Sequence, residues 1–118
     1  MDKILRQSLL YDFYGELLTA HQKRIYEDII LNDLSYTEVA REEGISRQGV
    51  YDMVKRCDKI LEEYEAKLHL VEKFQNAKQM VTDVKHLAKD ILKESVDEAV
   101  CKKLTQIVAI SNEIIDAY

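Results

Sequence analysis

The chain has 118 residues, a length that suits one compact domain or a small domain with a helical extension. No proline and only three glycines interrupt it, and this scarcity of turn-forming residues indicates a mostly helical fold. The net charge of −5 argues against tight non-specific binding to nucleic acid. Residues 35–60 carry five basic and five acidic side chains, so this segment is neutral within an acidic chain. Any affinity for phosphate must therefore come from the positions of individual basic side chains.

The opening residues alternate charged and apolar side chains instead of forming a secretory signal, and no apolar run approaches the ~20 residues that span a bilayer. We therefore expect a cytoplasmic protein without a membrane span. Cys57 and Cys101 are too far apart for a C-x-x-C motif, and we expect both to be small core residues. His21, His69 and His86 also lack metal-ligand spacing. No nucleophile–base pair or phosphate-binding glycine loop is present, so we expect no metal, no cofactor and no enzyme activity.

Apolar residues recur at intervals of three and four along almost the whole chain, which is the helical period. Thr19 and Gln22 form a capping box that predicts the start of the second helix, and Asn32-Asp33 predicts its end. We expect its buried stripe at Ile25, Tyr26, Ile29 and Ile30. In the first segment we expect the apolar side chains to fall largely on one face: Ile4, Leu5, Leu9, Tyr11, Phe13, Leu17 and Leu18.

A short third helix is predicted next. Ser35 and Glu38 form its capping box, and Leu34 and Val39 stand at the positions of a hydrophobic staple. Gly44 occupies the position after the helix where a left-handed residue is favoured. The helix is therefore expected to end there.

A long helical pattern begins after Ser46, a candidate N-cap, and runs to Ile91 with one three-residue stammer between Val71 and Ala77. One unbroken helix over residues 47–93 would be ~70 Å long, so we expect a break around residues 65–75. A third capping box, Ser95 with Glu98, predicts the start of the last helix, which apolar residues line from Val96 to Ile115. We expect a bundle over residues 1–66 and a helical extension over residues 67–118.

The stretch from Tyr36 to Val54 has the spacing of a DNA-binding helix-turn-helix. Ala40 is the small residue where the two helices would cross, and Gly44, four residues later, would make the turn. We expect Ile45, Val50 and Met53 to pin the second helix onto the first. The second helix would then present its candidate DNA-binding residues to solvent: Ser46, Arg47, Gln48, Tyr51, Asp52, Lys55 and Arg56.

These residue types suit distinct contacts. Arg47 can bind guanine bidentately and Gln48 can pair with adenine. Ser46 and the first amides of the helix can hold a phosphate, and Tyr51 can reach a phosphate or a thymine methyl group. Lys55 and Arg56 lie further along the helix, where their positive charges suit contacts with the phosphates of the DNA backbone.

Several runs of residues also carry a resemblance to a known family: Gln22 to Arg24, Ser35 to Ala40, Ser46 to Asp52, Lys55-Arg56 and Tyr64 to Leu68. Together they resemble the YlxM family, small helix-turn-helix proteins of Gram-positive bacteria. The resemblance covers most of the chain and is densest over residues 17–70. Gly49 departs from the alanine expected there, which loosens the second helix slightly.

The resemblance implies a fold like the promoter-reading region 4 of bacterial sigma factors. Genes of the family usually lie beside those for the signal recognition particle protein and its receptor. The resemblance therefore implies a regulator of, or an accessory to, that pathway, and it adds the particle's RNA or protein as a second possible target.

The sequence is compatible with three functions. The first is a dimeric DNA-binding regulator, paired through the C-terminal helices, whose apolar stripes we expect a small N-terminal unit to leave partly uncovered. The second is an accessory that binds signal recognition particle RNA or protein. The third is an interaction module with an architectural helix-turn-helix. The polar face favours the first, whereas the net charge and the nearby acids Glu42, Glu43 and Asp52 favour the others.

Overall fold

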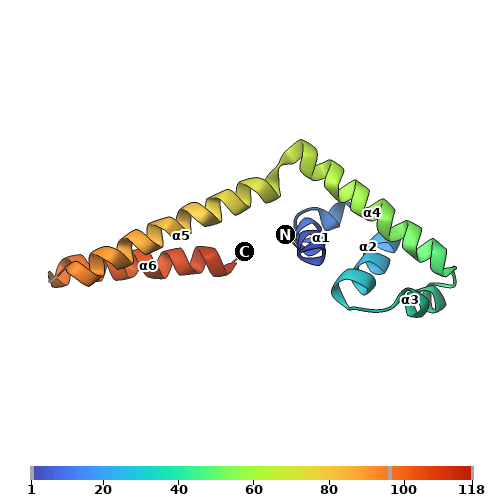
Figure 1. Cartoon of the computed structure of the whole chain (residues 1–118), viewed down its shortest axis with the longest axis horizontal. Coiled ribbons are helices and arrows are strands. Elements are labelled where there is room, and N and C mark those ends of the chain that lie inside the picture. The colour runs from blue at the N-terminus through green and yellow to red at the C-terminus, as the bar shows by residue number, and fades with distance from the viewer. Residues whose placement is uncertain (1, 96, 118) are drawn as a thin grey trace. The chain divides into compact units, whose positions relative to one another are not determined.

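In a computed structural model that describes residues 2–95 and 97–117, the chain folds into six α-helices, and these residues contain no strand (Figure 1). The all-α prediction is confirmed. The α-helices are α1 (Lys3–Tyr14), α2 (Ala20–Tyr26), α3 (Tyr36–Glu43), α4 (Arg47–Leu68), α5 (Leu70–Glu94) and α6 (Glu98–Ala117). A 3₁₀ turn, η1 (Gly15–Leu17), follows α1, and a π-helical turn, η2 (Glu27–Leu31), extends α2. The chain divides into two compact units, Met1–Val71 and Glu72–Tyr118.

Both early capping boxes form as predicted. The Thr19 hydroxyl accepts from the Gln22 amide at 3.2 Å while the Gln22 side chain accepts from the Thr19 amide at 2.9 Å. Ser35 and Glu38 make the same reciprocal pair at the start of α3. These bonds satisfy amides that have no partner inside the helix, so local sequence fixes where both helices begin.

The third capping box was predicted wrongly. The carboxylate of Asp97, not the Ser95 hydroxyl, accepts from the amides of Ala99 and Val100, at 2.9 and 3.2 Å. The Ser95 hydroxyl accepts from the Asp97 amide instead, one step before the helix. A carboxylate at a helix N-terminus also interacts favourably with the helix dipole, which favours Asp97 as the cap. The predicted apolar position Val96 lies outside the described residues.

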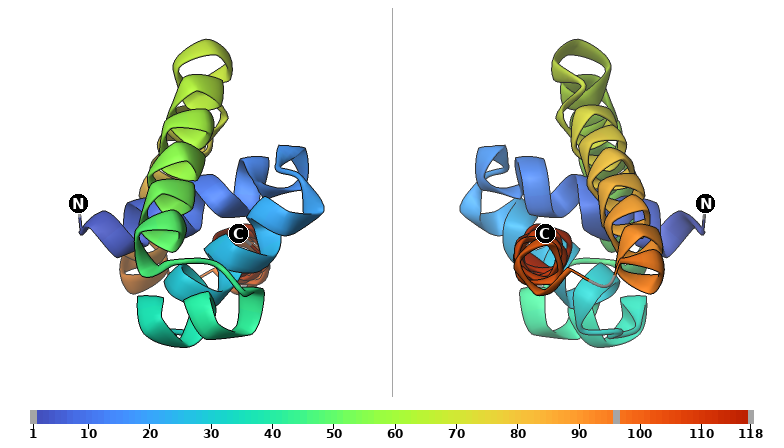
Figure 2. Two further views of the ribbon diagram at one scale, coloured as in Figure 1. Left: turned by 90° about the vertical axis from the view of Figure 1, so that its right-hand side faces the viewer. Right: turned by 90° about the vertical axis from the view of Figure 1, so that its left-hand side faces the viewer.

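The core of the first unit is built on one face of α4 (Figures 1 and 2). Along this face Val50, Val54, Cys57 and Leu61 are 0–3% exposed. The buried residues that join them from the preceding helices include Leu10, Tyr14, Ile25, Tyr26 and Val39. The buried face of α4 follows the helical apolar pattern predicted after Ser46, and the predicted burial of Ile25 and Tyr26 is confirmed, while Ile29 and Ile30 are partly buried against the core.

The predicted apolar face of the first helix was wrong in part. Ile4, Leu5 and Leu17 are 54–63% exposed, whereas Leu10 and Tyr14 carry the buried face of α1. The helix ends at Tyr14, and the 3₁₀ turn that follows breaks the 3.6-residue phase assumed for the residues beyond it. The burial of Tyr14 in the core was not predicted, and its buried hydroxyl needs hydrogen-bond partners.

Those partners lie at the break between α4 and α5. The Tyr14 hydroxyl donates to Glu65 at 2.6 Å and accepts from the Leu70 amide at 3.1 Å. Glu65 is 6% exposed and also accepts from the Val71 amide at 3.0 Å. Between the two helices His69 adopts a left-handed conformation with φ of 56°. The break predicted for residues 65–75 is confirmed, and its cause is this buried network, which satisfies the first amides of α5.

Replacing Tyr14 with Phe should destabilise the first unit by about 1–3 kcal/mol, because the Leu70 amide loses its acceptor and buried Glu65 loses a donor. Urea unfolding followed by circular dichroism measures the change. Tyr64→Phe is the matched control, since the Tyr64 ring stacks on Tyr14 at 5.9 Å and the ring is retained. Its effect should stay within about 0.5 kcal/mol. Equal losses in the two variants would contradict the role given to the Tyr14 hydroxyl.

Candidate nucleic-acid interface

The turn between α3 and α4 is fixed by backbone geometry. Gly44 has φ of 70°, a left-handed conformation that glycine adopts without steric cost. The Ala40 carbonyl accepts from the Gly44 amide and from the Ile45 amide, the latter at 3.1 Å. These bonds close the end of α3 and direct the chain straight into α4.

The start of α4 is capped and anchored. The Ser46 hydroxyl accepts from the Gly49 amide at 2.9 Å, which confirms the predicted N-cap. Val50 is fully buried and Met53 is partly buried against the core, whereas Ile45 is 37% exposed. Val50 therefore anchors the first turn of α4, and Ile45 contributes less than the sequence predicted because it lies in the turn itself.

All seven predicted site residues are exposed: Ser46, Arg47, Gln48, Tyr51, Asp52, Lys55 and Arg56. The structure brings Arg47, Gln48 and Tyr51 together with Tyr36 around a shallow hollow of about 420 Å³. The rings of Tyr36 and Tyr51 meet edge to face with centroids 6.0 Å apart. We call these four residues and Lys55 the α4 face.

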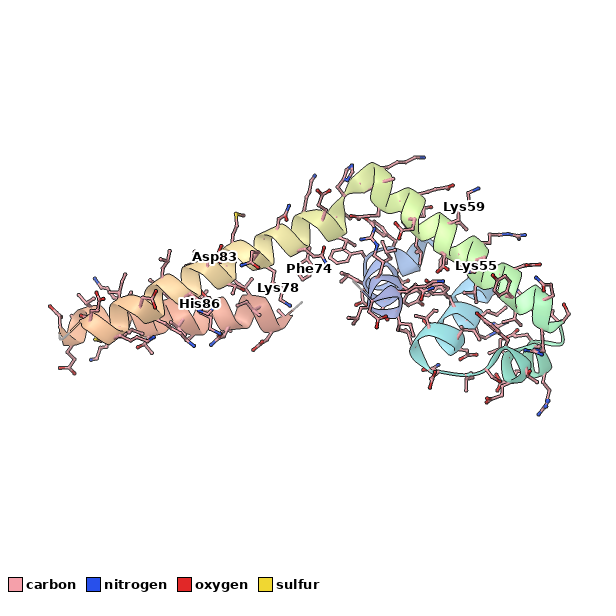
Figure 3. The ribbon with its side chains drawn as sticks, in the orientation of Figure 1. Lys55, Lys59, Phe74, Lys78, Asp83 and His86 are labelled. Carbon is pink, nitrogen blue, oxygen red and sulfur yellow. The ribbon has the colours of Figure 1, made fainter. Side chains whose placement is uncertain are left out.

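Basic side chains continue the α4 face along the helix. The Lys55 ammonium lies 5.4 Å from the centre of the Tyr51 ring, and Lys59 follows one turn later (Figure 3). Arg56 is exposed but falls about 100° around the helix from Lys55, so it flanks the face. The face thus combines a hollow with aromatic walls and a row of positive charge.

Gln48 and Asp52 are paired with each other. The Gln48 amide nitrogen donates to the Asp52 carboxylate at 2.9 Å, an i,i+4 pair along the helix surface. This bond orients the Gln48 amide and engages one carboxylate oxygen. The effect of Asp52 on the α4 face is therefore to hold the Gln48 amide in one orientation.

Of the acids expected to repel phosphate, Glu43 is neutralised locally. Its carboxylate accepts from the Arg24 Nε and Nη2 atoms at 2.6 and 2.9 Å, and His21 Nε2 lies 3.5 Å away. The hydrogen bonds from Arg24 lower the pKa of Glu43 below its usual value. The acidic character predicted beside the α4 face is thereby reduced, with Glu42 left exposed on α3.

Sequence reasoning missed one residue beside the α4 face and the role of another within it. Lys3 at the start of α1 lies against Lys55, and this contact lowers the pKa of Lys3. No sequence signal joins residues 52 positions apart, so only the fold reveals this pair. Tyr36 was seen as part of the motif, but its place in the wall of the hollow follows from the packing of α3 on α4.

Glu43→Gln should lower the free energy of unfolding at pH 7 by about 0.5–1 kcal/mol, because the partly exposed pair with Arg24 loses its charge. Since the folded-state pKa of Glu43 is depressed, its contribution is present above the unfolded-state value near 4.5 and is lost as the pH falls through the folded-state value. Urea unfolding at pH 7 and at pH 3 measures both points. The difference between the wild type and Glu43→Gln should shrink at pH 3, and a constant difference would contradict the assigned pair.

Within residues 2–95 and 97–117, no group of three or more His, Cys, Asp or Glu could hold a metal ion, and no helix is both long and apolar enough to cross a membrane. Cys57 is fully buried, as predicted, and burial raises the pKa of its thiol to about 11. Cys101 is a half-buried free thiol.

A short capped helix, a turn held by a left-handed glycine and a longer helix whose first turns stay open to solvent define a helix-turn-helix protein. A family model described as "Putative helix-turn-helix protein, YlxM / p13 like" matches residues 1–107, so the chain belongs to this family, UPF0122. It is a helix-turn-helix family and not an enzyme family by that description.

Relatives in several Bacillus species support the assignment. The chain is 41% identical over 107 residues to a UPF0122 protein of Bacillus velezensis, which covers 91% of this chain and 97% of the relative. It is 40% identical to the UPF0122 protein YlxM of Bacillus subtilis with the same coverage. A UPF0122 protein of Bacillus cereus is 41% identical over 108 residues, 92% of this chain and 93% of the relative.

Proposed function

We propose that the chain is a cytoplasmic, DNA-binding regulatory protein that docks the α4 face on duplex DNA and carries out no catalysis. The observation that supports this most directly is the division of α4 into two faces. Val50, Val54, Cys57 and Leu61 are buried, while the polar residues at the start of the helix are all exposed. A helix held in this way presents its N-terminal turns outward, which is how recognition helices enter the major groove.

The side chains on the α4 face suit base and phosphate contacts. Arg47 is the candidate for guanine, and Gln48, oriented by Asp52, is the candidate for adenine. The Ser46 hydroxyl keeps its hydrogen for a phosphate oxygen while its oxygen caps the helix. Tyr51 is 41% exposed and can contact a phosphate or a thymine methyl group.

Local charge supports binding despite the net charge of −5. Arg47, Lys55, Lys59 and Lys3 lie on or beside the α4 face, and Arg56 flanks it. If three to five of these charges meet phosphates, the logarithm of affinity should fall with the logarithm of salt concentration with a slope of about −2.7 to −4.5. The acidic remainder of the chain keeps non-specific binding weak, which favours recognition of particular sites.

We further propose that the acting form is a dimer. Two-fold pairing would carry two copies of α4 to a two-fold-symmetric DNA site. The alternative target, the RNA or protein of the signal recognition particle, draws on the gene neighbourhood of the family and on the acidic net charge. It serves as the competing outcome of the binding test.

The test is a fluorescence-anisotropy titration of a randomised duplex DNA pool and of signal recognition particle RNA, at low and physiological salt. Arg47→Ala should weaken binding to the duplex pool severalfold at low salt and reduce the salt slope by about one, because it removes one charged contact from the α4 face. Lys67→Ala is the matched control, because it removes one positive charge from the same helix ~30 Å along its axis. The control should bind duplex as the wild type does.

Each outcome is decisive. Duplex binding that weakens with salt and requires Arg47 supports the proposal. Binding to the RNA without binding to duplex would refute it in favour of the targeting pathway. Binding to neither at low salt would refute it in favour of a helix-turn-helix that is architectural.

A further inference from the structure

The second unit, Glu72–Tyr118, buries little of its own apolar surface. Among its described residues only Ala88, Leu104 and Ser111 are buried. The first unit, in contrast, buries a dozen hydrophobic residues in one cluster. A pair of helices of this size rarely forms a sufficient core alone, and pairing with another helical element is a common solution.

The exposed apolar side chains of this unit lie in two helical stripes. Four belong to α5 at spacings of four, three and four residues, and four belong to α6 at spacings of seven, three and four. All are 39–64% exposed: Met80, Val84, Leu87 and Ile91 on α5, and Val100, Ile107, Ile110 and Ile114 on α6.

The two stripes open on the same side of the hairpin. A groove of about 380 Å³ runs between them, and it is lined by Met80 and Val84 from α5 and by Ile107, Ile110 and Ile114 from α6. Its only polar lining residue among those described is Ser111, which is 4% exposed. We call this surface the apolar groove.

We infer that a second copy of the α5–α6 hairpin covers the apolar groove, so that two chains form a four-helix bundle. The eight exposed side chains offer roughly 700 Å² per copy, close to the ~800 Å² per partner of a standard stable interface. Four helices around an apolar core form a stable bundle, whereas two do not enclose one. This inference deepens the proposed dimer and rests on it, but it does not rest on DNA binding.

Charge also favours a second copy. Residues 72–118 contain seven lysines and eight acids, a net charge of −1, so two hairpins repel one another weakly. Helical periodicity places Asp83 and Asp90 on the edge of the α5 stripe that faces away from α6 (Asp83 in Figure 3). The same periodicity places Lys103 beside the α6 stripe. Packing α5 of one copy against α6 of the other brings these opposite charges together. Packing α5 against α5 would oppose like charges instead.

Sedimentation velocity of the full chain without nucleic acid, at 1–50 µM, tests the inference. The wild type should sediment as a dimer. Ile110→Lys should weaken the dimer by about 100-fold or more, because each dimer would bury two unpaired ammonium groups. Ala109→Lys is the matched control, since it adds the same side chain one residue away at an exposed position outside the groove. It should remain dimeric.

Circular dichroism keeps the comparison interpretable, because Ile110 is 56% exposed and a lysine there should leave the helices intact. A second substitution, Val84→Lys on the opposite wall of the groove, should have the same effect as Ile110→Lys. A wild-type monomer at 50 µM would overturn both the dimer and this interface. A dimer that survives both lysine substitutions would overturn the interface alone and leave the dimer standing.

Discussion

The fold of the first unit depends on the apolar face of α4. Helices α1, α2 and α3 have no sheet or second core to pack on, and they share the surface formed by Val50, Val54, Cys57 and Leu61. Because these side chains are buried in the core, α4 cannot rotate about its own axis, and its opposite side stays exposed to solvent. The same constraint that stabilises the unit therefore sets which residues form the α4 face.

Local signals in the sequence predicted the helix-turn-helix well. Capping hydroxyls at Thr19, Ser35 and Ser46 and the left-handed position of Gly44 depend on neighbours within a few residues, so sequence alone identifies them. Features that depend on distant residues were harder to predict. The break at His69 was placed by helix length, but its cause, the bond network between Tyr14 and Glu65, joins residues 51 positions apart.

The candidate site shows the same division. The exposed residues of α4 could be named because the helical period places them away from the apolar face of that helix. The contact of Lys3 with Lys55 and the neutralisation of Glu43 by Arg24 could not, because each joins helices whose packing the sequence does not state. These contacts make the surroundings of the α4 face more favourable to phosphate than its composition suggests. In the C-terminal helices the sequence likewise predicted apolar stripes, and the structure leaves many of their side chains exposed.

The central claim is that the exposed side of α4 is the surface that meets DNA. The most direct test is a titration of ¹⁵N-labelled protein with a short duplex at low salt, followed by amide chemical shifts. The account predicts the largest shifts at Arg47, Gln48, Tyr51 and Lys55, together with Lys3 on α1. Residues 72–117 should show none beyond small uniform changes. Shifts confined to the C-terminal hairpin, or no shifts at a duplex concentration well above that of the protein, would contradict it.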